Sequence, residues 1–123
     1  MRCFSKRLSQ LTINEVQEIE RFLHFNVSTI FHEPTFNRIV EEVFRTKCFY
    51  LLVYKQRRLI ALCPLHIVKK GIFTILYSNP ALFEVPYGGW VYERETVSIK
   101  DLISLIKLKF NELLVYWSLP QVE

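Results

Sequence analysis

The feature that most constrains the fold is a run of three apolar segments joined by very short connections. The segment Cys48 to Tyr54, CFYLLVY, is apolar on both faces and rich in aromatic residues, as expected of a central strand. The polar turn KQRR leads into LIALCPLHIV, and KKG leads into IFTILYS. Because connections this short cannot form a parallel crossover, we predict an antiparallel meander.

Helical patterns precede the meander. The segment TINEVQEIERFLHF predicts a first helix, in which Thr12 and Glu15 have the spacing of a capping box. Its expected apolar face is Val16, Ile19, Phe22 and Leu23. The segment EPTFNRIVEEVF predicts a second helix, with Pro34 in its first turn. Its expected buried stripe is Phe36, Ile39, Val40 and Val43.

The remaining elements complete an α+β chain. We expect a short first strand in RCFSKRLS and a kinked strand from Val85 to Tyr92. The segment SIKDLISLIKLKFNEL predicts a third helix, and LLVYWSL predicts a final strand. The expected stripe of the third helix is Ile99, Leu102, Ile103, Ile106 and Phe110. These elements give one domain over residues 1–123, with helices packed on a mixed sheet.

Composition limits the class of protein. Half of the 123 residues are hydrophobic, enough for a real core, and the formal charge of +4 is mild. The longest apolar run, Cys48 to Tyr54, is far shorter than a membrane span of about 20 residues. The N-terminal segment lacks a continuous apolar core of the kind found in secretion signals. With three irregularly spaced cysteines expected to be reduced, the sequence indicates a cytoplasmic protein.

Three stretches resemble a known superfamily. STIFHEPTFNRIVEEVF is similar to a helix opening with Phe31, His32 and Phe36, and YLLVYKQRRLIALCPLHIVKKG is similar to a β-hairpin ending in Pro64-Leu65. LYSNPALFEVPYGGWVYE is similar to a segment with Ser78, Pro80 and Tyr-Gly-Gly. With the element order, these stretches resemble the GCN5-related N-acetyltransferase (GNAT) superfamily. The closer resemblance is to its FemAB-like branch, which includes acyltransferases of cellulose and exopolysaccharide synthesis. One departure is KQRR, where that branch often has Asp-Gly.

The resemblance implies a function for the glycine segment. In FemAB-like enzymes an acyl or aminoacyl group passes to an amine or hydroxyl acceptor, commonly in cell-envelope material such as peptidoglycan. The resemblance implies that Tyr87, Gly88 and Gly89 border the acceptor site, with His32 and Phe36 nearby. The other reading of the glycines is a bulge that turns the strand toward the third helix.

A donor site is missing from the sequence. GNAT domains that bind acetyl-CoA carry a glycine-rich loop whose N–H groups bind pyrophosphate, and Gly71, Gly88 and Gly89 do not have its spacing. The chain therefore resembles the N-terminal portion of a larger acyltransferase, inactive alone, with no cofactor of its own. The complete family enzyme would use acyl-CoA or aminoacyl-tRNA as donor. The expected partner is the C-terminal half of such an enzyme.

An alternative is a non-enzymatic interaction module that pairs with another chain through the edge of its final strand. A second reading places that strand in the middle of the sheet.

Other candidate groups carry weaker signals. Cys63 and His66 lie three apart on a predicted strand, so they point to opposite faces and are not expected to form a dyad or a metal site. Glu84 and Glu93 flank the glycine segment and are candidate bases for an acceptor amine. The basic residues at the two hairpin tips lie at opposite ends of the meander, which disfavours a nucleic-acid surface, although the resemblance leaves tRNA contact open.

Overall fold

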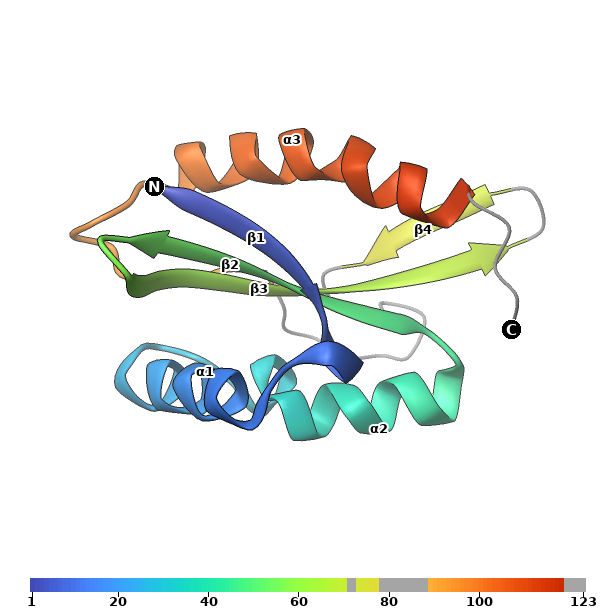
Figure 1. The fold of residues 1–123 in the computed structure, drawn as a ribbon, viewed down its shortest axis with the longest axis horizontal. Coiled ribbons are helices and arrows are strands. Elements are labelled where there is room, and N and C mark those ends of the chain that lie inside the picture. Colours follow the sequence, from blue (N-terminus) through green and yellow to red (C-terminus); the bar gives the residue numbers. More distant parts are fainter. Residues whose placement is uncertain (71–72, 78–88, 119–123) are drawn as a thin grey trace.

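The computed structural model describes residues 1–70, 73–77 and 89–118 of the chain. The fold is α+β, as predicted, with three helices and an antiparallel sheet. Helices α1 (Ile13–Phe25) and α2 (Pro34–Phe44) cover one face of the sheet, and α3 (Ile99–Ser118) covers the other (Figure 1). Two short 3-10 helices, η1 (Leu8–Gln10) and η2 (Ile30–His32), connect β1 to α1 and α1 to α2.

The sheet contains the predicted meander. Strands β2 (Lys47–Lys55), β3 (Arg58–Lys70) and β4 (Phe73–Tyr77) pair in sequence order, and β1 (Arg2–Arg7) pairs with β2. The short β5 (Val91–Tyr92) pairs with β3 beside Ala61 and Leu62. Every strand pair in the described part is antiparallel, so no parallel pair of the expected mixed sheet is present there.

A β-bulge interrupts the pairing of β2 with β3. The register shifts between Val53 and Tyr54, which pair with Ala61 and Leu59 and leave Ile60 as the extra residue. The carbonyl of Ile60 accepts a hydrogen bond from the backbone N–H of Glu93 at 3.0 Å. The bulge thereby ties the segment after β5 to the sheet.

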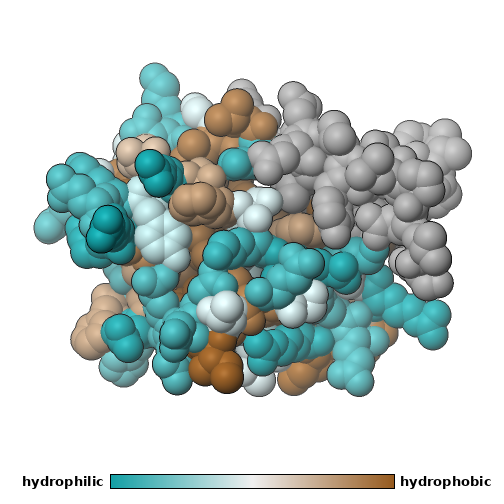
Figure 2. All heavy atoms as spheres, viewed as in Figure 1, coloured by the Kyte–Doolittle hydropathy of each residue, from teal (hydrophilic) through white to brown (hydrophobic). Residues whose placement is uncertain are grey.

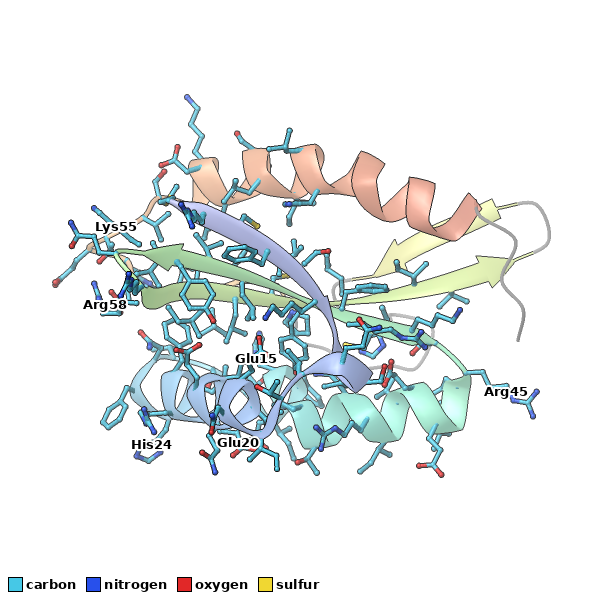
Figure 3. All side chains as sticks on the ribbon, in the orientation of Figure 1. Glu15, Glu20, His24, Arg45, Lys55 and Arg58 are labelled. Carbon is cyan, nitrogen blue, oxygen red and sulfur yellow. The ribbon has the colours of Figure 1, made fainter. Side chains whose placement is uncertain are left out.

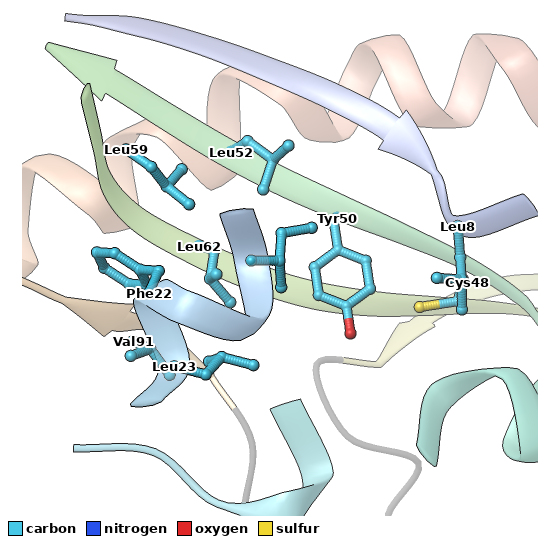
Figure 4. Close-up of a cluster of buried hydrophobic side chains, with 10 residues drawn as sticks. Leu8, Phe22, Leu23, Cys48, Tyr50, Leu52, Leu59, Leu62 and Val91 are labelled. Atoms are coloured by element: carbon cyan, nitrogen blue, oxygen red, sulfur yellow. The ribbon is translucent and has the colours of Figure 1, made fainter. Parts of the chain in front are cut away.

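The first helix forms as the sequence predicts. The Thr12 side chain accepts from the N–H of Glu15 at 3.1 Å, and the Glu15 carboxylate accepts from the N–H of Thr12 at 3.0 Å. Ile19, Phe22 and Leu23 are buried against the sheet. They belong to the hydrophobic cluster in Figure 4, which β2, β3 and β5 complete from the opposite side.

The predicted stripe of the second helix is wrong in part. Ile39 and Val43 are 55% and 63% exposed, whereas Pro34, Asn37 and Val40 are buried. The helix is rotated so that Asn37 faces the sheet, where its amide forms hydrogen bonds with strand side chains. Polar contacts therefore decide the orientation of this helix. As a result, hydrophobic residues are exposed at the surface over α1 and α2 (Figure 2).

The predicted final strand is wrong. Leu113 to Ser118 continue α3, and Leu119 lies outside the described residues. Short apolar runs rich in aromatic residues do not distinguish strand from helix, and here the helical period of the preceding residues continues. Leu102 is buried and Ile106 packs on the sheet, both as expected, but Ile99 and Ile103 are exposed and Leu105 packs on the sheet instead. The side chain of Phe110 lies outside the described residues. The described residues therefore contain no final strand of the kind that the alternative interaction module would use for pairing.

Within the described residues, no helix combines the length and hydropathy that crossing a bilayer requires.

Candidate functional site

The site begins with a pocket of about 670 Å³ between two connecting segments. One wall is the linker between α1 and α2, and the other is the stretch from Trp90 through β5 to the start of α3. The lining residues are Phe25, Asn26, Val27, Ser28, Thr29, His32, Trp90, Tyr92, Glu93, Arg94, Glu95 and Thr96. Aromatic rings, hydroxyl groups and charged groups of both signs therefore meet in one cavity.

The structure brings together part of the predicted site. His32 lines the pocket, and Gly89 directly precedes the lining residue Trp90. Gly89 has φ +89°, a conformation that side chains disfavour, which explains a glycine at this turn. Phe36 is not in the pocket lining, and its ring packs on Phe31 with centroids 5.1 Å apart. Tyr87, Gly88 and Glu84 lie outside the described residues.

A buried chain of hydrogen bonds supports the wall that carries His32. The Asn37 amide donates to the carbonyl oxygens of Phe31 and Glu33, both at 3.1 Å, and to the Tyr50 hydroxyl at 2.9 Å. The Tyr50 hydroxyl in turn donates to the carbonyl oxygen of His32 at 2.7 Å. Three consecutive carbonyls of η2 and its end are therefore held by two side chains from α2 and β2.

The chain of hydrogen bonds continues through His66 on β3. His66 Nε2 lies 2.6 Å from Asn37 Oδ1, and His66 Nδ1 lies 2.8 Å from Thr46 Oγ1. Because Oδ1 only accepts, Nε2 must donate, and the neutral ring then accepts at Nδ1 from the Thr46 hydroxyl. Burial lowers the pKa of His66 to about 4, so this ring is neutral near pH 7.

The environment of Tyr50 also favours its neutral form. Burial raises the pKa of its phenol well above the usual value, although the Asn37 hydrogen bond acts in the opposite direction. A neutral phenol keeps the proton with which it binds the His32 carbonyl. The whole chain from Thr46 to His32 is therefore uncharged and fixed in one hydrogen-bonding pattern.

Local hydrogen bonds fix the ring of His32. The backbone N–H of Thr29 donates to His32 Nδ1 at 3.1 Å, and the Thr29 hydroxyl lies at the same distance. A nitrogen that accepts from an N–H carries a lone pair, so the neutral ring has its proton on Nε2. In this state His32 acts as a hydrogen-bond donor through Nε2 and is not a base there.

Trp90 lines the pocket and also packs against the two apolar clusters on the α3 face of the sheet. Its indole Nε1 is buried and has no hydrogen-bond partner in the described part of the chain. A buried donor without a partner costs about 1–3 kcal/mol. A ligand oxygen that accepts from Nε1 would recover this free energy, which makes the indole a candidate binding group.

Glu93 is a poor candidate for the predicted base. Its carboxylate forms an ion pair with Arg58 and accepts from the Thr96 hydroxyl at 3.0 Å. The hydrogen bond from Arg58 lowers the pKa of Glu93, so the carboxylate binds a proton weakly. Glu95, exposed at the same pocket, is the second carboxylate in the lining.

The cysteines take no part in the site. Cys63 packs toward α3 while His66 faces α2, which confirms that the two point to opposite faces. Burial raises the pKa of the Cys48 thiol well above its usual value. Among the described residues no group of three possible ligands is placed to hold a metal ion.

Sequence reasoning missed the residues that support the pocket wall. Asn37, Tyr50 and Thr46 were assigned no role, and Asn37 replaced an expected apolar contact. One signal was available, because Asn37 lies three residues from both Pro34 and Val40, on the face that these two bury. The partners on the strands carry no comparable signal.

No protein-family model, curated protein or solved structure matches this chain.

Proposed function

We propose that this chain is the acceptor-binding part of a FemAB-like acyltransferase of the GNAT superfamily, acting in cell-envelope or polysaccharide metabolism. The observation that carries the proposal is the pocket formed by the His32 linker and the segment after Gly89. These are two of the regions on which the family resemblance rests. The element order of one strand, two helices, a meander and a further helix also agrees with the resemblance as far as α3.

The chemistry of the pocket suits a polar acceptor. His32 and Trp90 both line the pocket, and in our proposal the indole N–H of Trp90 donates to a hydroxyl or carbonyl oxygen of a sugar or peptide. Phe25, Trp90 and Tyr92 provide aromatic surface for the apolar faces of such ligands. The Glu95 carboxylate at the same pocket attracts an acceptor that carries an ammonium group.

The reaction requires a donor that this chain does not hold by itself. In acyl transfer the acceptor nitrogen or oxygen bonds to the acyl carbon, the bond to the leaving sulfur or ribose oxygen breaks, and the acceptor's proton passes to that leaving group. In our proposal this chain orients the acceptor, and a further polypeptide segment binds acyl-CoA or aminoacyl-tRNA. Orientation alone lowers the barrier by holding the reacting atoms close together.

NMR titration of the ¹⁵N-labelled chain tests acceptor binding. The two probes are a muropeptide with a free lysine amine and a cello-oligosaccharide that offers only hydroxyl groups. We expect one of them to shift backbone amides of residues 26–32 and 90–96. Trp90→Phe removes one donor and keeps an aromatic ring, so it weakens binding by about tenfold, the equivalent of one hydrogen bond.

Ile39→Ala is the control, because Ile39 is exposed on α2 and outside the pocket lining. It leaves the affinity unchanged if the pocket is the binding site. Absence of shifts with both probes at millimolar concentration contradicts acceptor binding. Saturable micromolar binding of acetyl-CoA that shifts the amides of residues 26–32 and 90–96, and that adenosine diphosphate does not displace, contradicts the absence of a donor site.

A further inference from the structure

A second hollow, of about 640 Å³, lies at the edge of the sheet beside the β2–β3 hairpin tip. Its lining residues are Met1, Arg2, Phe4, Lys6, Tyr54, Gln56 and Arg57. It shares no residue with the proposed acceptor pocket. Arg2, Phe4 and Lys6 alternate along β1, so all three side chains lie on the same face of the sheet, on which Lys6 reaches Glu15 of α1.

The charges in this hollow are not balanced. Lys6 forms an ion pair with Glu15 of α1, but Arg2 and Arg57 form no ion pair within the part of the chain that the structure describes. The adjacent Arg58, in contrast, is paired with Glu93. Two guanidinium groups without carboxylate partners favour an anion, and their planar arrays of donors match the oxygens of a phosphate.

The hollow also exposes an aromatic ring. Phe4 is 42% exposed, and its ring packs edge-to-face on Tyr54 with centroids 5.9 Å apart. The Tyr54 hydroxyl donates to the Glu18 carboxylate at 2.5 Å, which holds Tyr54 in place behind Phe4. Exposed aromatic rings beside cationic groups are typical of surfaces that stack nucleobases.

The hairpin tip holds Arg57 in an unfavourable conformation. The two loop residues, Gln56 and Arg57, have φ of 52° and 62°, in a two-residue turn that normally contains Asn-Gly. Left-handed conformations are disfavoured for residues with a side chain. Arg57 thus stands where glycine would be more stable, and its side chain lines the hollow.

We propose that this hollow binds a nucleotide, the phosphate ester of a nucleoside. Arg2 and Arg57 bind the phosphate, and Phe4 stacks on the base. The proposal is independent of the acyltransferase proposal, because the two sites lie in different places and use different chemistry.

Calorimetric titration of the full chain tests the ligand class. The probes are adenosine diphosphate, pyrophosphate, adenosine and a short single-stranded oligonucleotide. We expect adenosine diphosphate to bind at least tenfold more tightly than either pyrophosphate or adenosine, with affinity that falls as salt is added. Tighter binding of the oligonucleotide than of the diphosphate identifies the ligand as nucleic acid, and the reverse identifies it as a free nucleotide. No binding of either, or equal affinity for pyrophosphate, overturns the proposal.

Two glycine variants at the tip separate charge from backbone strain. Gln56→Gly and Arg57→Gly both relieve a left-handed residue, so each raises the melting temperature by about 2–4 °C. Only Arg57→Gly removes a cation, so it weakens nucleotide binding by about tenfold or more, while Gln56→Gly, which removes a neutral side chain from the same lining, weakens it by less than about threefold. Equal affinity of the two variants overturns the proposal.

Arg45→Ala controls for net charge. Arg45 follows α2 at the end of the molecule opposite to Lys55 and Arg58 of the hairpin (Figure 3). Arg45→Ala removes the same charge as Arg57→Gly, and we expect it to leave nucleotide affinity within twofold of that of the original chain. A loss as large as that of Arg57→Gly would mean that binding follows overall charge, and would overturn the assignment to the hollow.

Discussion

The two faces of the central sheet are stabilised in different ways, although the same strands form both. On the face toward α1 and α2, a hydrogen-bonded chain of Asn37, Tyr50 and His66 lies beside the apolar cluster. On the face toward α3, the buried side chains of the two clusters are apolar or thiol: Phe49, Leu51, Val53, Ile60, Ala61, Cys63, Leu65, Ile67, Val97 and Leu102.

The difference indicates that one face mainly stabilises the fold, whereas the other also fixes the position of particular atoms. Apolar burial is non-directional, so the α3 face holds the layers together without fixing any one atom. Hydrogen bonds are directional, and those of Asn37 and Tyr50 end on the carbonyls around His32. We infer that the α2 face fixes the pocket wall, and each prediction below tests this division.

The largest effect is expected at the centre of the polar chain. Asn37→Leu keeps the branched shape and heavy-atom count of the side chain but removes all of its hydrogen bonds, to His66, Tyr50 and two carbonyl oxygens. We expect the free energy of unfolding, measured in urea, to fall by about 4 kcal/mol. The NMR signal of the His32 amide shifts in the same variant.

A cavity on the other face should have a different signature. Leu102→Ala removes a fully buried side chain from the α3 face and lowers the free energy of unfolding by about 3 kcal/mol. The His32 amide signal stays in place, because the hydrogen bonds around η2 are untouched. Equal shifts of His32 in Leu102→Ala and Asn37→Leu would refute the division between the faces.

Acid should weaken the α2 face specifically. The unfolded chain binds a proton at His66 near its ordinary pKa of about 6.5, but the folded chain only near 4. His66 therefore stabilises the fold fully above pH 6.5, and stability falls as the pH decreases toward 4. Between pH 7 and pH 5 we expect a loss of about 2 kcal/mol attributable to this ring.

Two variants separate the contribution of His66 to the pH dependence of stability from that of the carboxylates. Urea unfolding of His66→Gln at both pH values loses this part of the dependence, whereas His24→Gln, at an exposed position, retains it. Identical pH profiles for His66→Gln and the original chain would show that His66 is not buried as a neutral ring.

The smallest effect is expected at the end of the hydrogen-bonded chain that reaches His32. Tyr50→Phe deletes the single hydroxyl that binds the His32 carbonyl and costs about 1 kcal/mol of stability. We expect faster hydrogen exchange at the amides of residues 30–33, measured by NMR, with no change on α3. Unchanged exchange at these residues would indicate that Asn37 alone holds the turn.

Local patterns in the sequence predicted most of the fold. The capping box at Thr12 and Glu15 and the turn between β2 and β3 each depend on residues close in the chain, and both are confirmed. The end of α3 was not predictable in this way. The run from Leu113 is apolar and aromatic, a composition that suits either state, and continuation of the preceding helix decided it.

The candidate site was predictable only in part. His32 and the glycine segment were identified from motifs, but the hydrogen bonds that support His32 join α2, β2 and β3. Contacts between residues that lie 13 and 29 positions apart have no local signature. The orientation of α2 failed for the same reason, since the partners of Asn37 decide which face is buried.

The central claim is that an uncharged hydrogen-bonded chain through His66 fixes the wall of the pocket. Long-range ¹H–¹⁵N NMR of the histidine side chains reads the proton on each ring nitrogen directly. From about pH 7 to pH 5 the result expected is a neutral His66 ring with its proton on Nε2 throughout. A charged ring near pH 5.5, or a proton on Nδ1, would contradict the account.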